Sequence, residues 1–250
     1  MNVKEFYNEF YERAEKSTAH ARFCELVYGK NLCQHGMADM VQIEEMIKLL
    51  GLNKNDRILD LGCGIGHITE YLYDRTNGFV TGVDISEIAI EKAKERIKGK
   101  NNLKFEIADI EELGYPSNSF NKIISIDTHY FVDDFEKFIL YLIKILSPGG
   151  KIGVFSDEGL ATPGHDDSEL EACESLIGKT LQKHKFKYKA INFTERNHLH
   201  WKLKEKVLIE LKEEFIKEDN SFLFKQRIEE CTRSNRDFDC RFLFVIEKSE

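Results

Sequence analysis

The sequence predicts an α/β fold with a doubly wound parallel sheet, and three observations support this prediction. Short apolar runs alternate with stretches of helical periodicity between about residues 57 and 156. The first run is followed directly by a glycine-rich turn, and the runs that come after it are followed by acidic residues. Strands that alternate with helices in this way form parallel sheets that helices cover on both faces.

The first fifty residues are predicted to be helical. Apolar residues recur at intervals of three and four from 3 to 14, which places them on one helical face. Further helices are expected over 18–28 and 40–50, and the more polar segment 28–39 is expected to be a loop. Residues 1–50 are therefore predicted to form an N-terminal helical cap.

The rest of the chain, residues 51–250, is predicted to be the core. Strands are expected at Arg57–Leu61, Phe79–Val83, Leu103–Ile107, Lys122–Ile126, Lys151–Phe155, Lys187–Thr194 and Arg241–Glu247. Helices are expected at 65–73, 86–97 and 135–146, the second one capped by Ser86. Two more helical stretches, 203–216 and 222–234, indicate a helical insertion around 195–235.

The composition narrows the class of protein and of partner. With 250 residues and 42% hydrophobic residues, the chain can bury a sizeable core. The net charge is −8, whereas a protein that binds a phosphate backbone usually presents a basic face. We therefore expect a small-molecule substrate and no nucleic acid.

The cysteines and the hydropathy pattern predict a cytoplasmic location. Six cysteines are scattered along the chain without a CxxC pair, which is typical of reduced thiols and not of a disulfide framework. No apolar run reaches the roughly 18 residues that a membrane helix needs, so no membrane association is expected.

The glycine-rich turn predicts close approach of a ligand to the backbone. Gly62, Gly64 and Gly66 in DLGCGIG follow a predicted strand and precede a predicted helix. A nicotinamide-binding loop has the spacing GxGxxG, and its third glycine would stand where this chain has His67. The loop therefore fits a ligand with an amino-acid end better than it fits a pyrophosphate.

An acidic residue lies near the carboxyl end of each of the first three predicted strands. Asp60 is placed to meet a cationic amino group, and Asp84 can accept hydrogen bonds from both hydroxyls of a ribose. Asp109 can accept from an adenine amino group, and the backbone N–H of Ile110 can reach a ring nitrogen. Asp84 as a helix-start residue and Asp109 as a solvated loop acid are the alternatives.

Five segments in order, ILDLGCGIGHIT, VTGVDIS, FEIADIEEL, NKIISIDTHYFV and LSPGGKIGVF, resemble the class I S-adenosylmethionine-dependent methyltransferases. The resemblance covers roughly residues 50–156. It implies a Rossmann-like seven-stranded sheet with six parallel strands and one antiparallel strand. It also implies S-adenosylmethionine as cofactor, bound across the carboxyl ends of the first strands.

The resemblance implies a role for individual residues. Asp60, Gly62 and Gly64 would face the methionine part of the cofactor, Asp84 the ribose, and Asp109 with Ile110 the adenine. Cys63 fits a common GCG variant of the loop and is given no nucleophilic role. The other expected cofactor contacts are Asp127 near the methionine end, Ile85 against the adenosine, and Tyr11, which could close over the cofactor. Core packing is the alternative for Ile85 and Tyr11.

The acceptor site is predicted from polar and aromatic residues outside these motifs. His35, His129 and Tyr130 are the candidates for catalysis, with structural roles as the alternative. The candidates for substrate contact are Tyr7, His35, Tyr130, Phe155, Asp157 and Trp201. His198 and His200 could ligate a metal, but no third ligand is paired with them, so no metal is expected.

The predicted function is methyl transfer to a small-molecule nitrogen, oxygen or carbon acceptor, by in-line displacement in a pocket closed by the N-terminal helices. No NPPY-type tetrapeptide follows the fourth strand, which disfavours DNA and protein-amide acceptors. The alternatives are a macromolecular (protein or RNA) methyltransferase, a non-catalytic S-adenosylmethionine-binding protein and a nicotinamide-dependent oxidoreductase. The apolar faces of the first helices leave open burial on the core or a homodimer.

Overall fold

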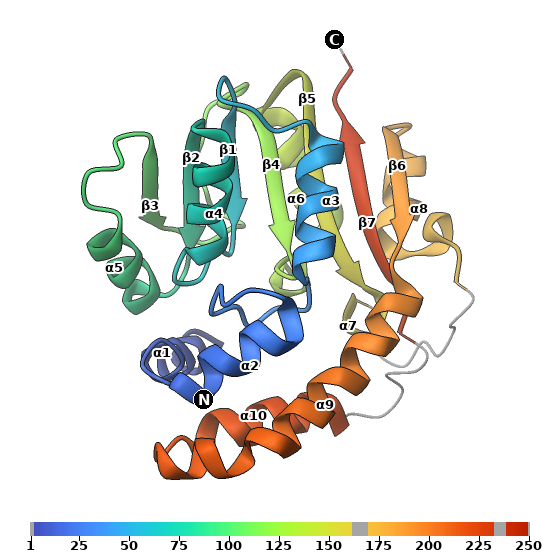
Figure 1. The fold of residues 1–250 in the computed structure, drawn as a ribbon. Helices are drawn as coiled ribbons and strands as arrows, with labels where there is room; N and C mark the ends of the chain where they lie inside the picture. The colour runs from blue at the N-terminus through green and yellow to red at the C-terminus, as the bar shows by residue number, and fades with distance from the viewer. Residues whose placement is uncertain (1–2, 162–169, 233–238, 250) are drawn as a thin grey trace.

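The computed structural model describes residues 3–161, 170–232 and 239–249, and its centre is a seven-stranded sheet (Figure 1). The strands follow the order β3-β2-β1-β4-β5-β7-β6. Their bounds are β1 Arg57–Leu61, β2 Phe79–Asp84, β3 Leu103–Ile107, β4 Phe120–Ile126, β5 Leu146–Asp157, β6 Lys187–Asn192 and β7 Arg241–Glu247. Only β7 runs antiparallel to its neighbours β5 and β6, so the expected fold class and strand directions are confirmed.

Helices cover both faces of the sheet, because successive residues of a strand point to opposite faces. Ile58 packs among α3 (Met40–Leu50), α4 (His67–Thr76) and α5 (Glu87–Arg96). Its neighbour Leu59 packs on the other face, among α6 (Phe135–Ile145) and α8 (Leu176–Lys183). Both strand faces are apolar for this reason, which explains the uninterrupted hydrophobic runs in the sequence.

The helix ends follow the capping residues. The Ser86 side chain accepts a hydrogen bond from the Ala89 N–H (3.1 Å), which confirms the predicted start of α5. Asp39 caps α3 in the same way through the Gln42 N–H (3.0 Å).

A layer of four helices lies across the carboxyl ends of the parallel strands (Figure 1). We call it the cap; it consists of α1 (Val3–Ala14), α2 (Thr18–Tyr28), α9 (Thr194–Lys217) and α10 (Ser221–Thr232). These helices share a hydrophobic cluster that includes Phe10, Phe23 and Phe215. The cap thus combines both ends of the chain, whereas α3, expected to belong to it, packs against β5 and β7.

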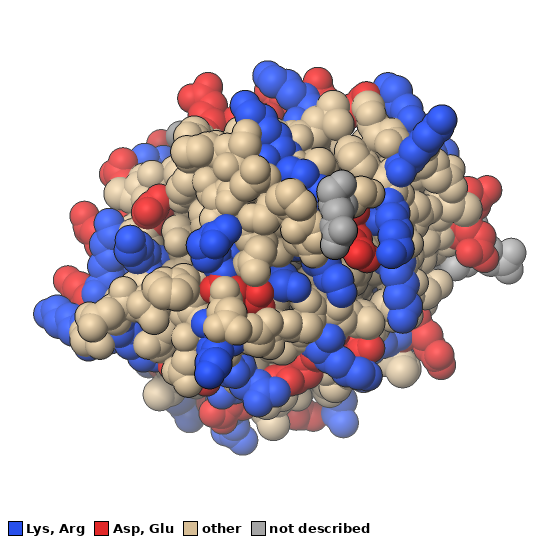
Figure 2. All heavy atoms as spheres, turned by 90° about the horizontal axis from the view of Figure 1, so that it is seen from above, with Lys and Arg blue, Asp and Glu red and all other residues tan. Residues whose placement is uncertain are grey.

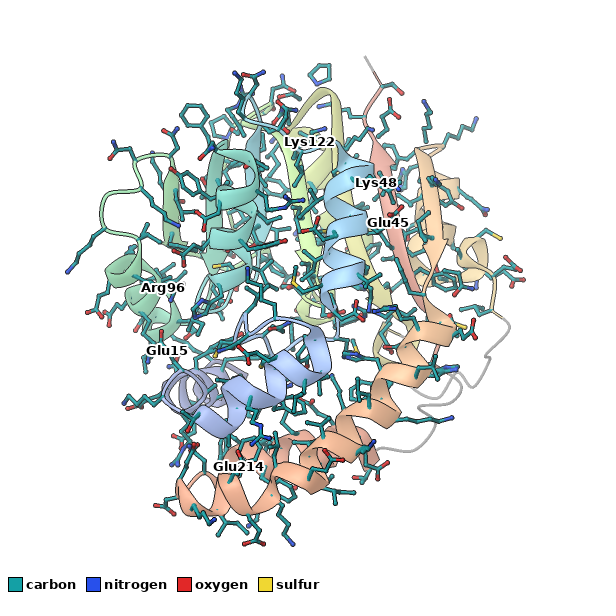
Figure 3. The ribbon with its side chains drawn as sticks, viewed as in Figure 1. Glu15, Glu45, Lys48, Arg96, Lys122 and Glu214 are labelled. Carbon is teal, nitrogen blue, oxygen red and sulfur yellow. The ribbon has the colours of Figure 1, made fainter. Side chains whose placement is uncertain are left out.

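Ion pairs connect the helices of the cap with one another and with the core, and Figure 3 labels three of the residues involved, Glu15, Arg96 and Glu214. Arg22 of α2 pairs with Glu214 of α9 at 2.7 Å, and Arg96 of α5 approaches Glu15 at 3.5 Å. An exposed pair such as Arg22 with Glu214 contributes about 0–1 kcal/mol, so we infer that apolar packing is the main force that holds the cap in place.

The second half of the chain contains elements that the sequence pattern did not predict. They are α7 (Glu158–Ala161), the short 3-10 helices η1 (His129–Phe131) and η2 (Ala172–Glu174), and α8. Helix α9 begins at Thr194, nine residues before the expected 203, and the Asn192 side chain accepts from the Thr194 N–H (2.8 Å) just before it starts. Residues 233 and 234 of the expected last helix lie outside the described residues.

Basic side chains are frequent on the face opposite the cap, where the parallel strands begin (Figure 2). Two of them contact the carboxyl end of α3: Lys122 Nζ donates to the Leu50 carbonyl (2.6 Å) and Lys151 Nζ to that of Leu49 (3.4 Å). Cations are favourable at this negative end of a helix dipole. Among the described residues, no helix is both long and apolar enough to span a membrane.

Candidate active site

The glycine-rich turn after β1 places bare backbone at the carboxyl edge of the sheet. Gly62 and Gly64 have φ values of +66° and +55°, which side chains rarely adopt. A Cβ on Gly62 would overlap the Thr128 side chain, and one on Gly64 would overlap the ring of Tyr11. Glycine is therefore required at both positions by conformation and by space.

Asp84, the last residue of β2, is fixed by the backbone of this turn. One carboxylate oxygen accepts from the Gly64 N–H at 2.8 Å and the other from the Ser86 N–H at 2.9 Å. Burial raises the pKa of Asp84, and these N–H groups counteract the rise. Each oxygen keeps a further lone pair, so the carboxylate can still accept from two hydroxyls of a ligand.

Asp60 lies beneath the turn and is 3% exposed. The Thr69 hydroxyl donates to its carboxyl group at 2.6 Å, and burial raises the pKa of Asp60 to about 7. Together with Cys63 it lines a small cavity of about 50 Å³ beside the turn. Burial also raises the pKa of the Cys63 thiol, which agrees with the expectation that it is not a nucleophile.

A cavity of about 700 Å³ lies between the carboxyl edge of the sheet and the cap. The core contributes Asp84, Ile85, Asp109, Ile110, Asp127, Thr128, Tyr130 and Phe131, among others. The cap and the loop before α3 contribute Phe6, Tyr7, Tyr11, His35, Gly36, Met37, Trp201, Gln226 and Glu230. Most of the predicted cofactor and substrate residues are thus brought together around one space.

The segment after β3 forms one end of the cavity. Asp109 is exposed and accepts from the Glu111 N–H at 2.9 Å, which forms a tight turn. Ile110 is buried, whereas Ile85, after β2, is 42% exposed. An exposed isoleucine at the cavity wall favours ligand contact over the alternative of core packing.

His35 and Glu230 form a close pair at the other end of the cavity. Their Nε2 and Oε1 atoms are 2.9 Å apart. Burial lowers the pKa of His35, and the Glu230 carboxylate only partly reverses this, so the imidazole is neutral at pH 7. Burial works to raise the pKa of Glu230, but His35 and Arg227 outweigh it and hold that pKa well below its usual range.

Arg227 of α10 fixes the loop that carries His35. Its guanidinium donates to the carbonyls of His35 (2.9 Å) and Gln34 (2.6 Å), and it contacts Glu230 at 3.3 Å. It also lies over the Phe10 ring at 5.0 Å. The position of His35 therefore depends on a helix almost two hundred residues away in the chain.

Asp127 holds the same loop from the core side. Arg241 donates to its two oxygens at 2.7 and 3.2 Å, and the Met37 N–H donates at 2.7 Å. Burial favours a raised pKa here, but the Arg241 charge outweighs it and lowers the pKa of Asp127. Both oxygens are thus engaged by the protein, so its expected contact with the cofactor remains a prediction that competes with these bonds.

Three of the residues predicted for catalysis or substrate contact do not line the cavity, and the local geometry explains why. His129 is 3% exposed and packs against Phe135, because the short helix η1 turns Tyr130 and Phe131 toward the cavity instead. Phe155 is fully buried in the sheet core, since alternation along β5 points it away from the site. These placements correct the expected catalytic role of His129 and the expected substrate contact of Phe155.

Asp157 is the third of them, and it is fully buried. It accepts from the Asn197 side-chain amide at 3.0 Å, and its backbone N–H donates to the Tyr130 hydroxyl. Asp157 therefore positions Tyr130 from behind and does not contact a ligand directly, which corrects the expected substrate contact.

Several cavity residues were not predicted from the sequence. Phe6 and Phe131 are direct neighbours of the predicted Tyr7 and Tyr130, so local periodicity could have suggested them. Gln226 and Glu230 had no comparable signal, because only the folding of α10 over the loop at 35–37 brings them there. Within the described ranges no group of three or more His, Cys, Asp or Glu side chains is placed to hold a metal ion.

The comparisons with known proteins agree with this geometry. A family model described as a methyltransferase domain matches residues 52–212. Phosphoethanolamine N-methyltransferase 1 of Arabidopsis thaliana is 33% identical over 138 residues, which is 55% of this chain and 28% of that protein. A sterol 24-C-methyltransferase of Gibberella zeae is 28% identical over 68% of this chain and 44% of its own length. The chain thus spans less than half of these relatives.

Solved structures share the fold at low sequence identity. Phosphoethanolamine N-methyltransferase 2 of Haemonchus contortus has a TM-score of 0.68 at 20% identity, over 98% of this chain and 60% of that one. The [4+2]-cyclase SpnF has a TM-score of 0.75 at 16% identity, over 99% and 96%. The chain belongs to the methyltransferase-domain family, which confirms the resemblance of its motifs to the class I S-adenosylmethionine-dependent methyltransferases.

Proposed function

We propose that this protein transfers the methyl group of S-adenosylmethionine to a small molecule bound in the large cavity. The observation that carries the proposal is that one cavity joins two sets of residues. Gly62, Asp84 and Asp109 line it on the side of the cofactor turn, and His35, Tyr130 and Glu230 line it on the side of the cap. Donor and acceptor can therefore occupy the same enclosed space.

The proposed placement of the cofactor follows the carboxyl edge of the sheet. Asp60 lies nearest to the methionine amino group, Asp84 accepts from the ribose, and Asp109 with the Ile110 N–H meets the adenine. The space that Gly62 and Gly64 leave open lets the ligand approach the backbone. The positions of Asp84, Asp109 and Ile110 around the cavity support this orientation.

The chemistry then requires alignment more than activation. The methyl carbon of a sulfonium is already electrophilic, so the protein needs to hold the acceptor in line and exclude water. The cap provides the cover. His35, neutral at pH 7, is the candidate base for an acceptor that must lose a proton.

Calorimetric titration with S-adenosylmethionine and S-adenosylhomocysteine tests the first half of the proposal. We expect both to bind, and Asp84→Ala to lose most of the affinity. Asp133→Ala, which removes an exposed aspartate outside the cavity lining, should bind normally. Tight binding of a nicotinamide dinucleotide without S-adenosylmethionine binding would overturn the proposal.

Release of S-adenosylhomocysteine tests the second half. Incubation of the protein and S-adenosylmethionine with panels of small amines, phenols and carboxylates should yield S-adenosylhomocysteine with at least one class. Cofactor binding without turnover on any panel, or turnover only on protein or RNA, would favour the alternatives of a binding protein or a macromolecular methyltransferase.

Location and assembly are part of the proposal. We propose a cytoplasmic protein that binds no nucleic acid, and its six free cysteines support a reducing compartment. A homodimer is the proposed assembly, and sedimentation at several protein concentrations would detect it. Cell fractionation would test the location.

A further inference from the structure

The charge of the cavity wall is one-sided. Five carboxylates line it: Asp84, Asp109, Glu111, Asp127 and Glu230. Among the described residues that line it there is no lysine and no arginine, although the chain has 36 of them. A ligand in this cavity therefore meets acidic groups without a basic group in direct contact.

Three cations lie behind the wall, and each is turned to the protein. Arg241 donates to Gln42 (2.7 Å) and to Asp127, and Arg227 donates to two loop carbonyls and lies near Glu230. Lys204 is 1% exposed, and its Nζ lies 4.1 Å from the centre of the Trp201 ring and 5.2 Å from that of the Tyr28 ring. Burial lowers the pKa of Lys204 to about 8. None of these three cations lines the cavity.

Aromatic rings supply much of the remaining wall at the acceptor end. Tyr7 meets His35 edge to face at 5.2 Å and Phe131 at 6.0 Å, and Phe6 and Trp201 lie around the same space. Ring faces attract cations, above all where water is excluded. Glu230, with 13% of its side chain exposed, adds an ionised carboxylate among these rings.

We propose that the methyl acceptor is a cationic amine that carries no phosphate, and that its ammonium group lies against Glu230 and the rings of Tyr7 and Phe131. Asp84 and Asp109 lie at the cofactor end, and Arg241 donates to both oxygens of Asp127. Glu230 lines the acceptor end, so it is the carboxylate that the ammonium would meet there, beside its own partners His35 and Arg227. A phosphomonoester dianion in the same place would face this acidic wall, and the lining residues that the structure describes include no cation to compensate its charge. This inference rests on the proposed methyl transfer.

The transfer balances with the groups at hand. The Nε2 atom of His35 lies 2.9 Å from Glu230, and a neutral imidazole that carries its one proton on Nε2 keeps a lone pair on Nδ1. The acceptor ammonium gives its proton to this imidazole or to water, and the freed nitrogen lone pair forms the new bond to the methyl carbon. The bond between sulfur and that carbon breaks, and sulfur keeps the electron pair.

Calorimetry on the intact protein saturated with S-adenosylhomocysteine tests the inference with three probes. They are dimethylaminoethanol, its phosphate monoester, and isoamyl alcohol, which has the shape of dimethylaminoethanol without the charge. We expect dimethylaminoethanol to bind at least tenfold more tightly than either of the others. Equal or tighter binding of the phosphate monoester, or binding of none of the three, would overturn the inference.

Variants assign the effect to the proposed residues. Glu230→Gln should weaken dimethylaminoethanol binding about tenfold, because an ionic hydrogen-bond partner becomes neutral, and leave isoamyl alcohol unaffected. Glu112→Gln, an exposed acid outside the lining, is the matched control. Phe131→Leu removes a ring that is 47% exposed, so folding should persist while amine binding falls severalfold. Unchanged amine affinity in both cavity variants would contradict the inference.

The cofactor product separates this failure from a failure of the proposed function. S-adenosylhomocysteine should bind to all of these variants with the affinity of the unchanged protein. If the unchanged protein does not bind it, the methyltransferase proposal fails and this inference fails with it.

Discussion

Asp60→Asn should make the stability of the unliganded protein less dependent on pH. The carboxyl of Asp60 is buried and accepts a hydrogen bond from the Thr69 hydroxyl, and burial raises its pKa from 3.8 to about 7. The folded protein therefore holds a proton that the unfolded chain releases at a lower pH. The stabilising contribution of the protonated form is complete below pH 3.8 and is lost as the pH rises to about 7.

The size of the effect follows from the two pKa values. A difference of about three units between the pKa values of the unfolded and folded states, at 1.36 kcal/mol per unit, corresponds to about 4 kcal/mol of unfolding free energy. Of this, about 2.5 kcal/mol falls between pH 5 and pH 8, because the unfolded carboxyl is already largely ionised at pH 5. Asparagine keeps the shape and can still accept from Thr69, but it does not ionise.

Urea unfolding of both proteins at pH 5 and pH 8 measures the difference. We expect Asp60→Asn to gain about 2.5 kcal/mol relative to the unchanged protein on going to pH 8. Asp133→Asn, at an exposed position, should show no such gain. A stability difference between Asp60→Asn and the unchanged protein that is the same at both pH values would refute the reasoning.

Three further predictions concern the glycine-rich turn, the ion pair of Asp127 with Arg241, and the candidate base His35. Gly64→Ala should lower S-adenosylmethionine affinity at least tenfold in calorimetry, since its Cβ overlaps Tyr11 and its φ is positive, whereas Gly99→Ala, with open space around it, should not; equal affinity would contradict this. Arg241→Ala should cost about 3–5 kcal/mol in urea unfolding, because it leaves the Asp127 carboxylate buried without its partner. The double variant Asp127→Leu with Arg241→Met should lose less unfolding free energy than Arg241→Ala, because neither charge is then left buried alone. A loss equal to the sum of the two single-variant losses would contradict a stabilising interaction between the two residues. In a plot of kcat/KM against pH, protonation of His35 should produce a fall in activity on the acidic side with its midpoint below pH 6.5. This fall should disappear in His35→Gln, and a fall that persists in the variant would show that another group causes it.

Local sequence patterns predicted the cofactor side of the site, because residues close together in the sequence form it. The turn at 62–66, and the acids Asp84 and Asp109, follow their strands directly, so alternation and spacing suffice to place them at one edge of a parallel sheet. The strands were found for the same reason. Helix α8 was missed because eight residues give too short a stripe to separate from a loop.

The acceptor end depends on contacts that no local pattern specifies. The apolar run of β5 is buried on both faces, so periodicity could not say to which side Phe155 points. The orientation of η1 determines that Tyr130 and not His129 faces the cavity, and a three-residue helix has no periodic signal from which that orientation could be predicted. The pairing of Glu230 with His35 joins segments that are distant in sequence, so only the assembled cap reveals it.

The cap's origin from opposite ends of the chain has a consequence for folding. The bond between Arg227 and His20 spans 207 positions, whereas the contact of Asp84 with Gly64 spans 20. Contacts of long sequence separation form only after a large entropic cost of chain closure. The cofactor side of the cavity can therefore assemble early, while the acceptor side becomes complete only when the last helices close onto the first ones. Nascent chains released before α10 is made would carry the cofactor turn without a finished acceptor pocket.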